Sequence, residues 1–241
     1  NCITGYGKDI GDLLVKHHGI AMISFTGSAD VGNRIAILAN RVPLVLELGG
    51  KDPAIVLSDA DLEKTAKEIV KGALSYNGQR CTAIKRVLVV PEVHDKLTSL
   101  ILKEIKSLTI GLANHNTDIT PLISVKSAEY VKELVDDAIK FHHAKPLTEI
   151  IFDKNLVHPI VLDEVSLESK IAWEEPFGPV IPIIICKDFK ECIEVANKSE
   201  YGLQASIFTR NMRLAEEIAK ELDCGTVNIN SAPSRGPDIF P

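Results

Sequence analysis

The chain has 241 residues, of which 45% are hydrophobic and 25% are charged, and its formal net charge is -6 at pH 7. This composition is ordinary for a globular protein with one large domain or parts of two. The negative charge argues against a nucleic-acid partner. No apolar run approaches the roughly 20 residues of a membrane-spanning helix.

The cysteines and histidines show no metal-ligand spacing. An odd number of cysteines without a CxxC pair favours free thiols in a reducing compartment, so we expect a cytoplasmic protein. His17 and His18 are adjacent, as are His142 and His143, and neighbouring side chains point in different directions, so we expect no metal site. The five cysteines are Cys2, Cys81, Cys186, Cys192 and Cys224.

The first part of the chain contains strands that lead into helices. The apolar run 21–26 predicts a short strand, and the glycine and serine after it open a helix to about residue 40. The runs 42–48 and 54–57 are typical of buried strands. Acidic residues in the first turn and apolar residues at helical spacing then predict a helix over 59–75.

The same alternation continues to the end of the chain. Strands are expected at 87–90, 180–186, 205–208 and 225–229, and short extended segments at 150–152 and 159–162. Helices are expected at 92–108, 127–141, 189–198 and 212–222, with a polar loop at 113–120. Alternating strands and helices predict an α/β fold in which helices flank a mainly parallel sheet.

Cys81 alone among the cysteines lies in a polar, glycine-interrupted turn beside an arginine. A neighbouring cation favours the thiolate, which is the form of cysteine that attacks carbon. The simpler alternative is a buried cysteine that packs as a small hydrophobe. The turn is therefore a candidate site of nucleophilic catalysis.

Glu47 ends an apolar run and is followed by Leu48 and two glycines. A carboxylate in this position is a candidate general base, and the alternative is a solvent-exposed or ion-paired acid. Together, one nucleophile and one base indicate acyl transfer through a thioester.

Two further segments have unusual composition. Residues 25–32 lie where a strand leads into a helix, whose first N–H groups attract anions, but the glycine spacing is neither GxGxxG nor a Walker loop. The alternative is a tight turn in which Ser28 caps the helix. Residues 173–179 place an acid close to an aromatic ring in a proline-rich turn, which suits either a nucleotide contact or a purely structural turn.

Four motifs, in this order and at these spacings, resemble those of the aldehyde dehydrogenase superfamily: FTGS (25–28), ELGG (47–50), GQRC (78–81) and EPFGP (175–179). The resemblance covers essentially the whole chain. Segments 77–83 and 228–238 most resemble the non-phosphorylating, NADP-dependent glyceraldehyde-3-phosphate dehydrogenases of that superfamily. It implies that residues 1–49 are the C-terminal part of a Rossmann-like NAD(P)-binding domain and that residues 50–241 are the catalytic domain.

The resemblance also implies roles for individual residues. Cys81 attacks the aldehyde to give a thiohemiacetal, which passes hydride to the nicotinamide and leaves a thioester, and Glu47 activates the water that hydrolyses it. The Cys81 backbone N–H helps to hold the oxyanion. Arg235 and Arg80 are expected to bind the substrate phosphate through the guanidinium fork, with a surface ion pair as the alternative. The residues assigned to the cofactor are Gly27, Ser28, Gly32, Leu48, Glu175 and Phe177.

The function implied is the oxidation of glyceraldehyde 3-phosphate to 3-phosphoglycerate with NADP, or with NAD as the alternative cofactor. The full-length protein is expected to be a homodimer or homotetramer. Two alternatives stay open: another aldehyde dehydrogenase for a small polar aldehyde such as succinic semialdehyde, and a non-catalytic domain that retains the fold. A CoA-acylating relative is disfavoured, because Glu47 provides an activator of water that thiolysis does not need.

Part of the family pattern lies outside the sequence. The first part of the dinucleotide domain, its oxyanion asparagine and the final oligomerisation segment have no counterpart in these residues. We therefore expect the chain to be truncated at both ends. By itself it should bind the cofactor poorly and show little turnover.

Overall fold

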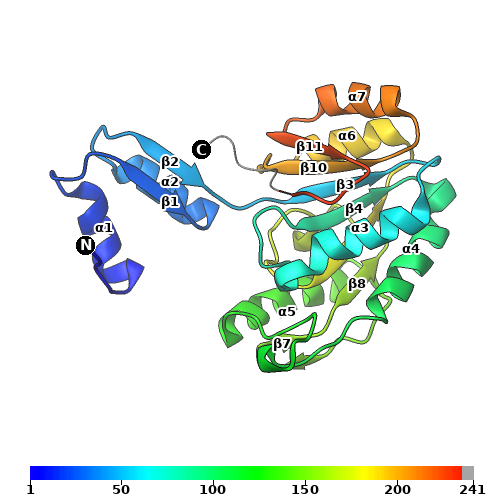
Figure 1. The fold of residues 1–241 in the computed structure, drawn as a ribbon, viewed down its shortest axis with the longest axis horizontal. Helices are drawn as coiled ribbons and strands as arrows, with labels where there is room; N and C mark the ends of the chain where they lie inside the picture. Colours follow the sequence, from blue (N-terminus) through cyan, green and yellow to red (C-terminus); the bar gives the residue numbers. More distant parts are fainter. Residues whose placement is uncertain (235–241) are drawn as a thin grey trace. The chain divides into compact units, whose positions relative to one another are not determined.

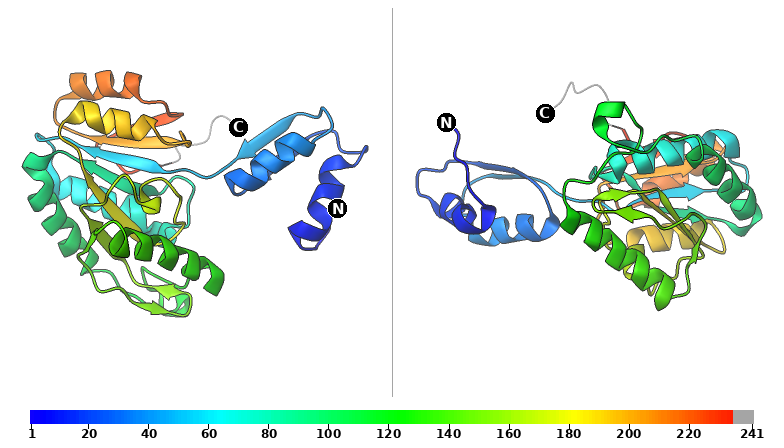
Figure 2. Two further views of the ribbon diagram at one scale, coloured as in Figure 1. Left: turned by 180° about the vertical axis from the view of Figure 1, so that it is seen from behind. Right: turned by 90° about the horizontal axis from the view of Figure 1, so that it is seen from below.

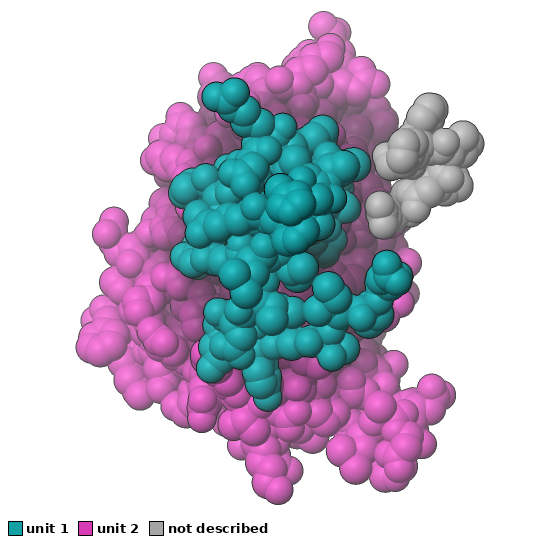
Figure 3. Space-filling model, turned by 90° about the vertical axis from the view of Figure 1, so that its left-hand side faces the viewer, with its two compact units in different colours: residues 1–49 teal, residues 50–241 magenta. Residues whose placement is uncertain are grey.

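In the computed structural model of the protein, residues 1–234 are described. The chain divides into two compact units, Asn1–Gly49 and Gly50–Pro241 (Figure 3). Within residues 1–234, no helix combines the length and the apolar character that crossing a membrane requires.

The first unit contains two helices and a small parallel sheet. Strands β1 (Ile23–Thr26) and β2 (Leu44–Glu47) pair in parallel, with Thr26 opposite Glu47. Helix α2 (Ala29–Leu38) connects them, and the Ser28 side chain caps it by accepting a hydrogen bond from the Val31 N–H at 3.4 Å. Sequence reasoning missed α1 (Gly7–Lys16), in which glycines at the first position and at 11 weaken the helical signal.

A strand is present within 42–48 as predicted, but the expectation that it is buried is wrong. Side chains along β2 alternate between half-buried and exposed, and Val45 is 40% exposed. A sheet of two strands has one face covered within this unit, so its apolar side chains alternate between the two environments.

The second unit is built on a seven-stranded sheet (Figure 1). Its strand order is β11-β10-β3-β4-β9-β8-β5, and neighbouring strands are parallel except β5 and β8. The prediction of an α/β fold with a mainly parallel sheet is confirmed. The strands are β3 (Asp52–Val56), β4 (Ile84–Val89), β5 (Lys145–Pro146), β8 (Ile160–Asp163), β9 (Val180–Ile185), β10 (Gln204–Phe208) and β11 (Thr226–Ile229).

Helices cover both faces of this sheet. Helices α3 (Leu62–Leu74) and α4 (Pro91–Ile105) lie together on one face, and α6 (Phe189–Asn197) lies on the other, as opposite views show (Figures 1 and 2). Helix α7 (Met212–Glu221) packs against β10. The core is made mainly of Val, Ile, Leu and Ala side chains, with Phe208, Cys186 and Cys192, and every residue of β3 and β4 is buried.

Smaller elements complete the second unit. Helix α5 is Val125–Lys140, and the hairpin of β6 (Phe152–Asp153) and β7 (Leu156–Val157) replaces the extended segment expected at 150–152. The polar loop expected at 113–120 contains a 3-10 turn, η2 (Ala113–His115). The other 3-10 turns are η1 (Ser75–Gly78) and η3 (Lys170–Ala172).

Candidate active site

Three segments of the second unit meet because they lead into three neighbouring parallel strands. Gly50 precedes β3, Cys81 precedes β4, and Glu175 precedes β9, and these strands are adjacent in the sheet. The Gly50 N–H donates to Glu175 Oε1 at 3.3 Å. A Cβ atom at Gly50 would lie 2.6 Å from the Cys81 carbonyl oxygen, so the backbones are in direct contact there.

The turn before Cys81 has an uncommon backbone. Tyr76, Asn77 and Gly78 follow one another with φ angles of 53°, 57° and 70°, in the left-handed region that residues other than glycine rarely adopt. A Cβ atom on Gly78 would lie 2.2 Å from the Gly178 carbonyl oxygen. Glycine is therefore required at 78, where the turn touches the segment that leads into β9.

Side-chain amides hold this turn against the loop before α5. Asn77, which is buried, donates to Thr120 Oγ1 at 2.9 Å and accepts from the Thr120 N–H at 2.8 Å. Gln79 Oε1 accepts from the Ile123 N–H at 2.9 Å. These amide contacts compensate for the left-handed backbone, whose cost is of the order of 1–3 kcal/mol per residue.

Lys85 links the Cys81 turn to Glu175. Its ammonium donates to the carbonyl oxygens of Arg80 and Cys81, both at 2.7 Å, and pairs with Glu175 Oε1 at 2.8 Å. Sequence reasoning missed this residue. The available signal was a lysine next to an arginine at the start of an otherwise apolar strand, which is uncommon in a buried sheet.

The five cysteines are free thiols in different surroundings. Cys81 is half-buried in its turn, whereas Cys186 and Cys192 are buried in the core. A hydrogen bond with the Cys186 thiol, together with burial, raises the pKa of the Cys192 thiol. Burial, followed by the nearby Asp52 carboxyl, raises the pKa of Cys224. A raised pKa disfavours the thiolate, so Cys192 and Cys224 are poor nucleophiles.

Phe177 lies in the strained turn that leads into β9. Its φ angle is 44° and its side chain is 41% exposed, although an aromatic residue strongly disfavours this conformation. The turn is fixed on one side by the Tyr130 hydroxyl, which donates to Glu174 Oε2 at 2.7 Å, and by the Trp173 indole, which donates to the Leu167 carbonyl at 2.6 Å. Such strain is concentrated at functional sites, so it supports a ligand-contacting role for this ring.

The two arginines expected to bind phosphate differ in what the structure describes. The half-buried Arg80 guanidinium donates to the Gly72 carbonyl of α3 at 3.0 Å, and its buried Nε has no hydrogen-bond partner among residues 1–234. Part of the fork is therefore engaged within the protein, and a phosphate contact at Arg80 stays a prediction. Arg235 lies outside the described residues.

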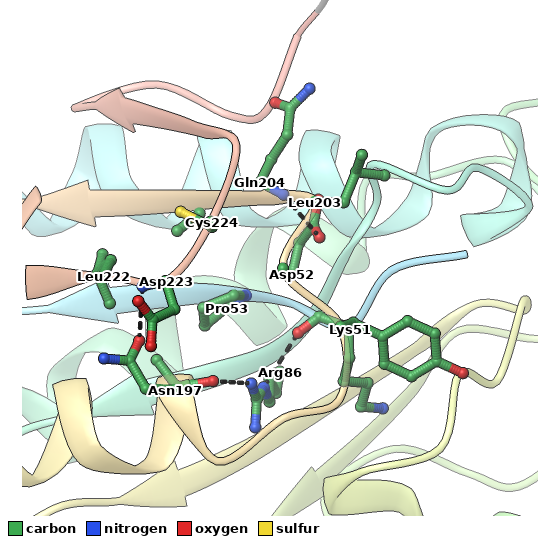
Figure 4. A pocket seen from close by; sticks show the side chains of 14 residues that line it. Lys51, Asp52, Pro53, Arg86, Asn197, Leu203, Gln204, Leu222, Asp223 and Cys224 are labelled. Carbon is green, nitrogen blue, oxygen red and sulfur yellow. Dashed lines mark hydrogen bonds between the residues drawn. The ribbon is translucent and has the colours of Figure 1, made fainter. Parts of the chain in front are cut away.

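A group of buried charged residues lies behind this site and was not anticipated from the sequence. Arg86 donates to the Lys51 carbonyl at 3.1 Å (Figure 4). It also donates to the Val195 and Ala196 carbonyls near the end of α6 at 3.2 and 3.0 Å. Those carbonyls carry the negative end of the helix dipole. Asp52 Oδ1 accepts from the Gln204 N–H at 3.2 Å.

Burial dominates the ionisation of this group. It raises the pKa of Asp52 to about 7, although the Lys85 charge acts in the opposite direction. It also lowers the pKa of Arg86 to about 10. The pKa of Lys51 is lowered well below its ordinary value by burial and then by repulsion from Arg86 and Lys85. Lys51, Asp52 and Arg86 line one pocket with residues of the α6–β10 loop and the segment after α7.

The first unit collects its own candidate residues at the carboxyl ends of β1 and β2. The Gly27 N–H donates to the Glu47 carbonyl at 3.1 Å, and Ser28 begins the exposed N-terminus of α2. A Cβ atom at Gly32 would lie 2.4 Å from a Leu48 methyl group, so this glycine allows close packing of helix on strand end. Glu47 has an exposed side chain.

The structure thus forms two clusters from the residues predicted by sequence. Gly27, Ser28, Gly32, Glu47 and Leu48 lie together in the first unit, and Arg80, Cys81, Glu175 and Phe177 lie together in the second. Among residues 1–234, no group of three or more His, Cys, Asp or Glu side chains is arranged to hold a metal ion.

Comparison with known proteins shows which proteins this chain is similar to. The NADP-dependent glyceraldehyde-3-phosphate dehydrogenase of Streptococcus equinus is 51% identical over 241 residues, which are 100% of this chain and 50% of that protein. The crystal structure of the enzyme of that name from Bacillus halodurans C-125, complexed with NADP, matches with a TM-score of 0.97 and 52% identity, covering 99% of this chain and 50% of that one. The chain spans about half the length of the relatives it matches.

A second structure extends the likeness to a less similar protein. The glyceraldehyde-3-phosphate dehydrogenase of Methanocaldococcus jannaschii, also complexed with NADP, matches with a TM-score of 0.94 and 38% identity, covering 99% of this chain and 52% of that one. The model of the aldehyde dehydrogenase family matches residues 1–241. Because the family model matches every residue of the chain and a structure of 52% identity has the same fold, this chain belongs to the aldehyde dehydrogenase family.

Proposed function

We propose that the protein containing this chain oxidises glyceraldehyde 3-phosphate to 3-phosphoglycerate with NADP and without inorganic phosphate. The observation that carries the proposal is the half-buried Cys81 in a turn that is bonded to the Glu175 segment. The names of the most similar proteins support the substrate and the cofactor.

In the proposed mechanism, Cys81 is the nucleophile. Its sulfur attacks the aldehyde carbon, an S–C bond forms, and the carbonyl electrons move to oxygen, which accepts a hydrogen bond from the Cys81 backbone N–H. Loss of a hydride from the thiohemiacetal carbon leaves a thioester on Cys81. Bound NADP supplies the hydride acceptor for this chemistry.

Glu47 is the proposed general base of the second half-reaction. Its carboxylate takes a proton from water as the water oxygen attacks the thioester carbonyl. The C–S bond then breaks, the acid leaves, and the Cys81 thiolate is restored. Its exposed side chain at the end of β2 is accessible to water, as this role requires.

The residues present fit a dinucleotide. Gly27 and Ser28 stand at the exposed N-terminus of α2, where N–H groups and the helix dipole favour a pyrophosphate. Gly32 permits the close packing of α2 against Leu48. Glu175 offers a carboxylate to ribose hydroxyls, and the exposed Phe177 ring offers a face to a planar nicotinamide.

We also propose that residues 1–49 are part of the cofactor-binding domain and residues 50–241 are the catalytic domain, which the division into two compact units supports. Five free thiols support a reducing, cytoplasmic compartment. The assembly proposed is a homodimer or homotetramer, as the resemblance implies.

The test is NADPH formation by the full-length protein with glyceraldehyde 3-phosphate, measured with and without inorganic phosphate. We expect the wild-type protein to reduce NADP without inorganic phosphate. The Cys81→Ala variant should lose this activity but keep its binding affinity for NADP. Glu47→Gln should still release one equivalent of NADPH in a burst and then stall at the thioester. If NADP is reduced with succinic semialdehyde but not with glyceraldehyde 3-phosphate, the proposed substrate is wrong and the small polar aldehyde takes its place. Inactivity with every aldehyde would favour a non-catalytic domain.

A further inference from the structure

We propose that Lys85 is a positioning residue that sets the Cys81 turn and the Glu175 carboxylate in one arrangement. The inference rests on the proposed function, in which Cys81 is the nucleophile and Glu175 contacts the cofactor. Lys85 touches neither substrate nor cofactor in this scheme and acts through those two residues.

The first support is the complete pairing of a buried cation. The Lys85 side chain is 2% exposed, and its three N–H donors have three acceptors: the Arg80 carbonyl, the Cys81 carbonyl and Glu175 Oε1. Charge-assisted bonds of 2.7–2.8 Å are among the stronger hydrogen bonds in proteins. A buried ammonium needs such partners, so each of the three acceptors is held to a fixed position around one point.

The second support is the backbone of β4, which places Lys85 outside the regular strand pairing. Asp52 of β3 pairs with Ile84 and Pro53 pairs with Arg86, so Lys85 is the extra residue of a bulge. Bulges redirect a side chain and are frequent next to active sites. Because of this bulge, the Lys85 side chain reaches the turn that precedes β4, and the Arg86 side chain reaches the carbonyls near the end of α6.

The third support is that Glu175 Oε1 is held from two sides. This oxygen pairs with the Lys85 ammonium at 2.8 Å and accepts a hydrogen bond from the Gly50 N–H at 3.3 Å. This fixes the direction of the carboxylate before a ribose arrives, which reduces the ordering required on binding. The same ammonium fixes the Cys81 carbonyl, and thereby the peptide that carries the nucleophile.

Two separable effects follow for the full-length enzyme. Lys85→Met removes the charge at similar length, and we expect it to raise KM for NADP about tenfold through Glu175. We expect it to lower kcat about 10- to 100-fold through the Cys81 turn, since small displacements of reacting groups cost about this much. The exposed lysine variant Lys190→Met, on α6, is the matched control and should change neither parameter.

A double-mutant comparison separates positioning from a general loss of structure. In a Glu175→Gln background, Lys85→Met should no longer change KM for NADP but should still lower kcat. Equal effects of Lys85→Met on KM in both backgrounds would overturn the link to Glu175. Unchanged kcat and KM in a folded Lys85→Met variant would overturn the whole inference. Lys85→Arg keeps the charge but cannot direct three bonds from one atom, so we expect its KM for NADP to be closer to the wild-type value than its kcat is. This variant provides the test if Lys85→Met does not fold.

A chemical readout that does not depend on turnover completes the test. The rates at which anionic iodoacetate and neutral iodoacetamide alkylate Cys81 are measured by mass spectrometry, and their ratio reports the charge near the sulfur. We expect Lys85→Met to lower this ratio about threefold or more relative to wild type and Lys190→Met, because a nearby cation is lost. An unchanged ratio would overturn the link to Cys81. If wild type lacks NADP-dependent activity but the ratio falls, the proposed function fails while the link to Cys81 stands.

Discussion

The two units present their candidate residues at opposite ends of their parallel strands. In the first unit, Gly27 follows β1 and Glu47 is the last residue of β2, at the carboxyl ends where the N-terminus of α2 also lies. In the second, Cys81 and Glu175 precede β4 and β9, at the amino ends. The carboxyl end suits anions because helix N-termini gather there, whereas the amino end must obtain its positive charge from a side chain, here Lys85.

The units also differ in how they are stabilised. Within residues 1–49, all of which the structure describes, Ile35 is the one buried apolar side chain, and large apolar side chains such as Ile37 are exposed. The second unit has a continuous core across its sheet. A unit with so small a core has little hydrophobic free energy to offset chain entropy.

The largest expected effect comes from separating the units. A polypeptide of residues 50–241 should unfold in one cooperative thermal transition, because it keeps the sheet and its core. A peptide of residues 1–49 should show no cooperative transition by circular dichroism. A folded 1–49 peptide with a sharp melting curve would contradict the contrast drawn from burial.

The next largest effect is expected from a glycine-to-alanine substitution, which we compare between the two units. Gly78→Ala adds a Cβ atom 2.2 Å from the Gly178 carbonyl at a φ of 70°, so we expect a loss of about 3 kcal/mol in the free energy of unfolding. Gly11→Ala, on α1 with no atom within 4 Å of the new Cβ among the described residues, should not destabilise the protein. Urea unfolding of the whole chain measures both, and equal effects would show that the tight turn is not a constraint.

A third prediction concerns the buried charges of the second unit. The folded-state pKa of Asp52 is about 7, above its ordinary 3.8, so between about pH 4 and pH 7 the unfolded chain releases this proton while the folded protein keeps it. Stability should therefore fall as pH rises through that window and then level off. Asp52→Asn stays neutral, so it should be about 2–4 kcal/mol more stable than wild type at pH 8 and similar to it below pH 4.

Denaturant unfolding at several pH values measures that difference. The control is Asp12→Asn in the first unit, where the carboxylate pairs with Arg34 at 2.5 Å in an exposed position. Exposed pairs contribute little, so this variant should follow the wild-type pH profile. Parallel profiles for wild type and Asp52→Asn would show that burial does not govern this carboxyl.

The smallest effect is expected at His94 of α4. Burial lowers its pKa, but hydrogen bonds with Asp163 at 2.7 Å and Asp95 at 2.8 Å outweigh burial and leave the pKa above its ordinary value. A histidine with a raised folded-state pKa stabilises fully below about pH 6.5, its unfolded value, and this contribution is lost as pH rises through the folded-state pKa.

His94→Gln should accordingly lower the free energy of unfolding at pH 5.5 by about 1–2 kcal/mol, and by less at pH 8.5. His17→Gln, an exposed site in the first unit, is the control. A loss that grows with pH would reverse the assigned sign.

Local pattern was sufficient for the elements that have their own signals. Apolar runs and turn residues located most strands and most helices but not the short strands β5 and β7, and the GQRC turn made Cys81 the candidate nucleophile. The same reasoning failed for β2, because a run of apolar residues does not show how many strands its sheet has. It missed α1, because glycine obscured a helical period.

By itself, the sequence determined the α/β class, the family resemblance and the residue types available for thioester chemistry, since each depends on spacing along the chain. Only the tertiary structure decided that Lys85 joins Cys81 to Glu175, that Gly78 touches Gly178, and that Asp52 is buried. These contacts depend on strand order and on a bulge in β4. Both are set by packing between residues far apart in the chain, which no local pattern encodes.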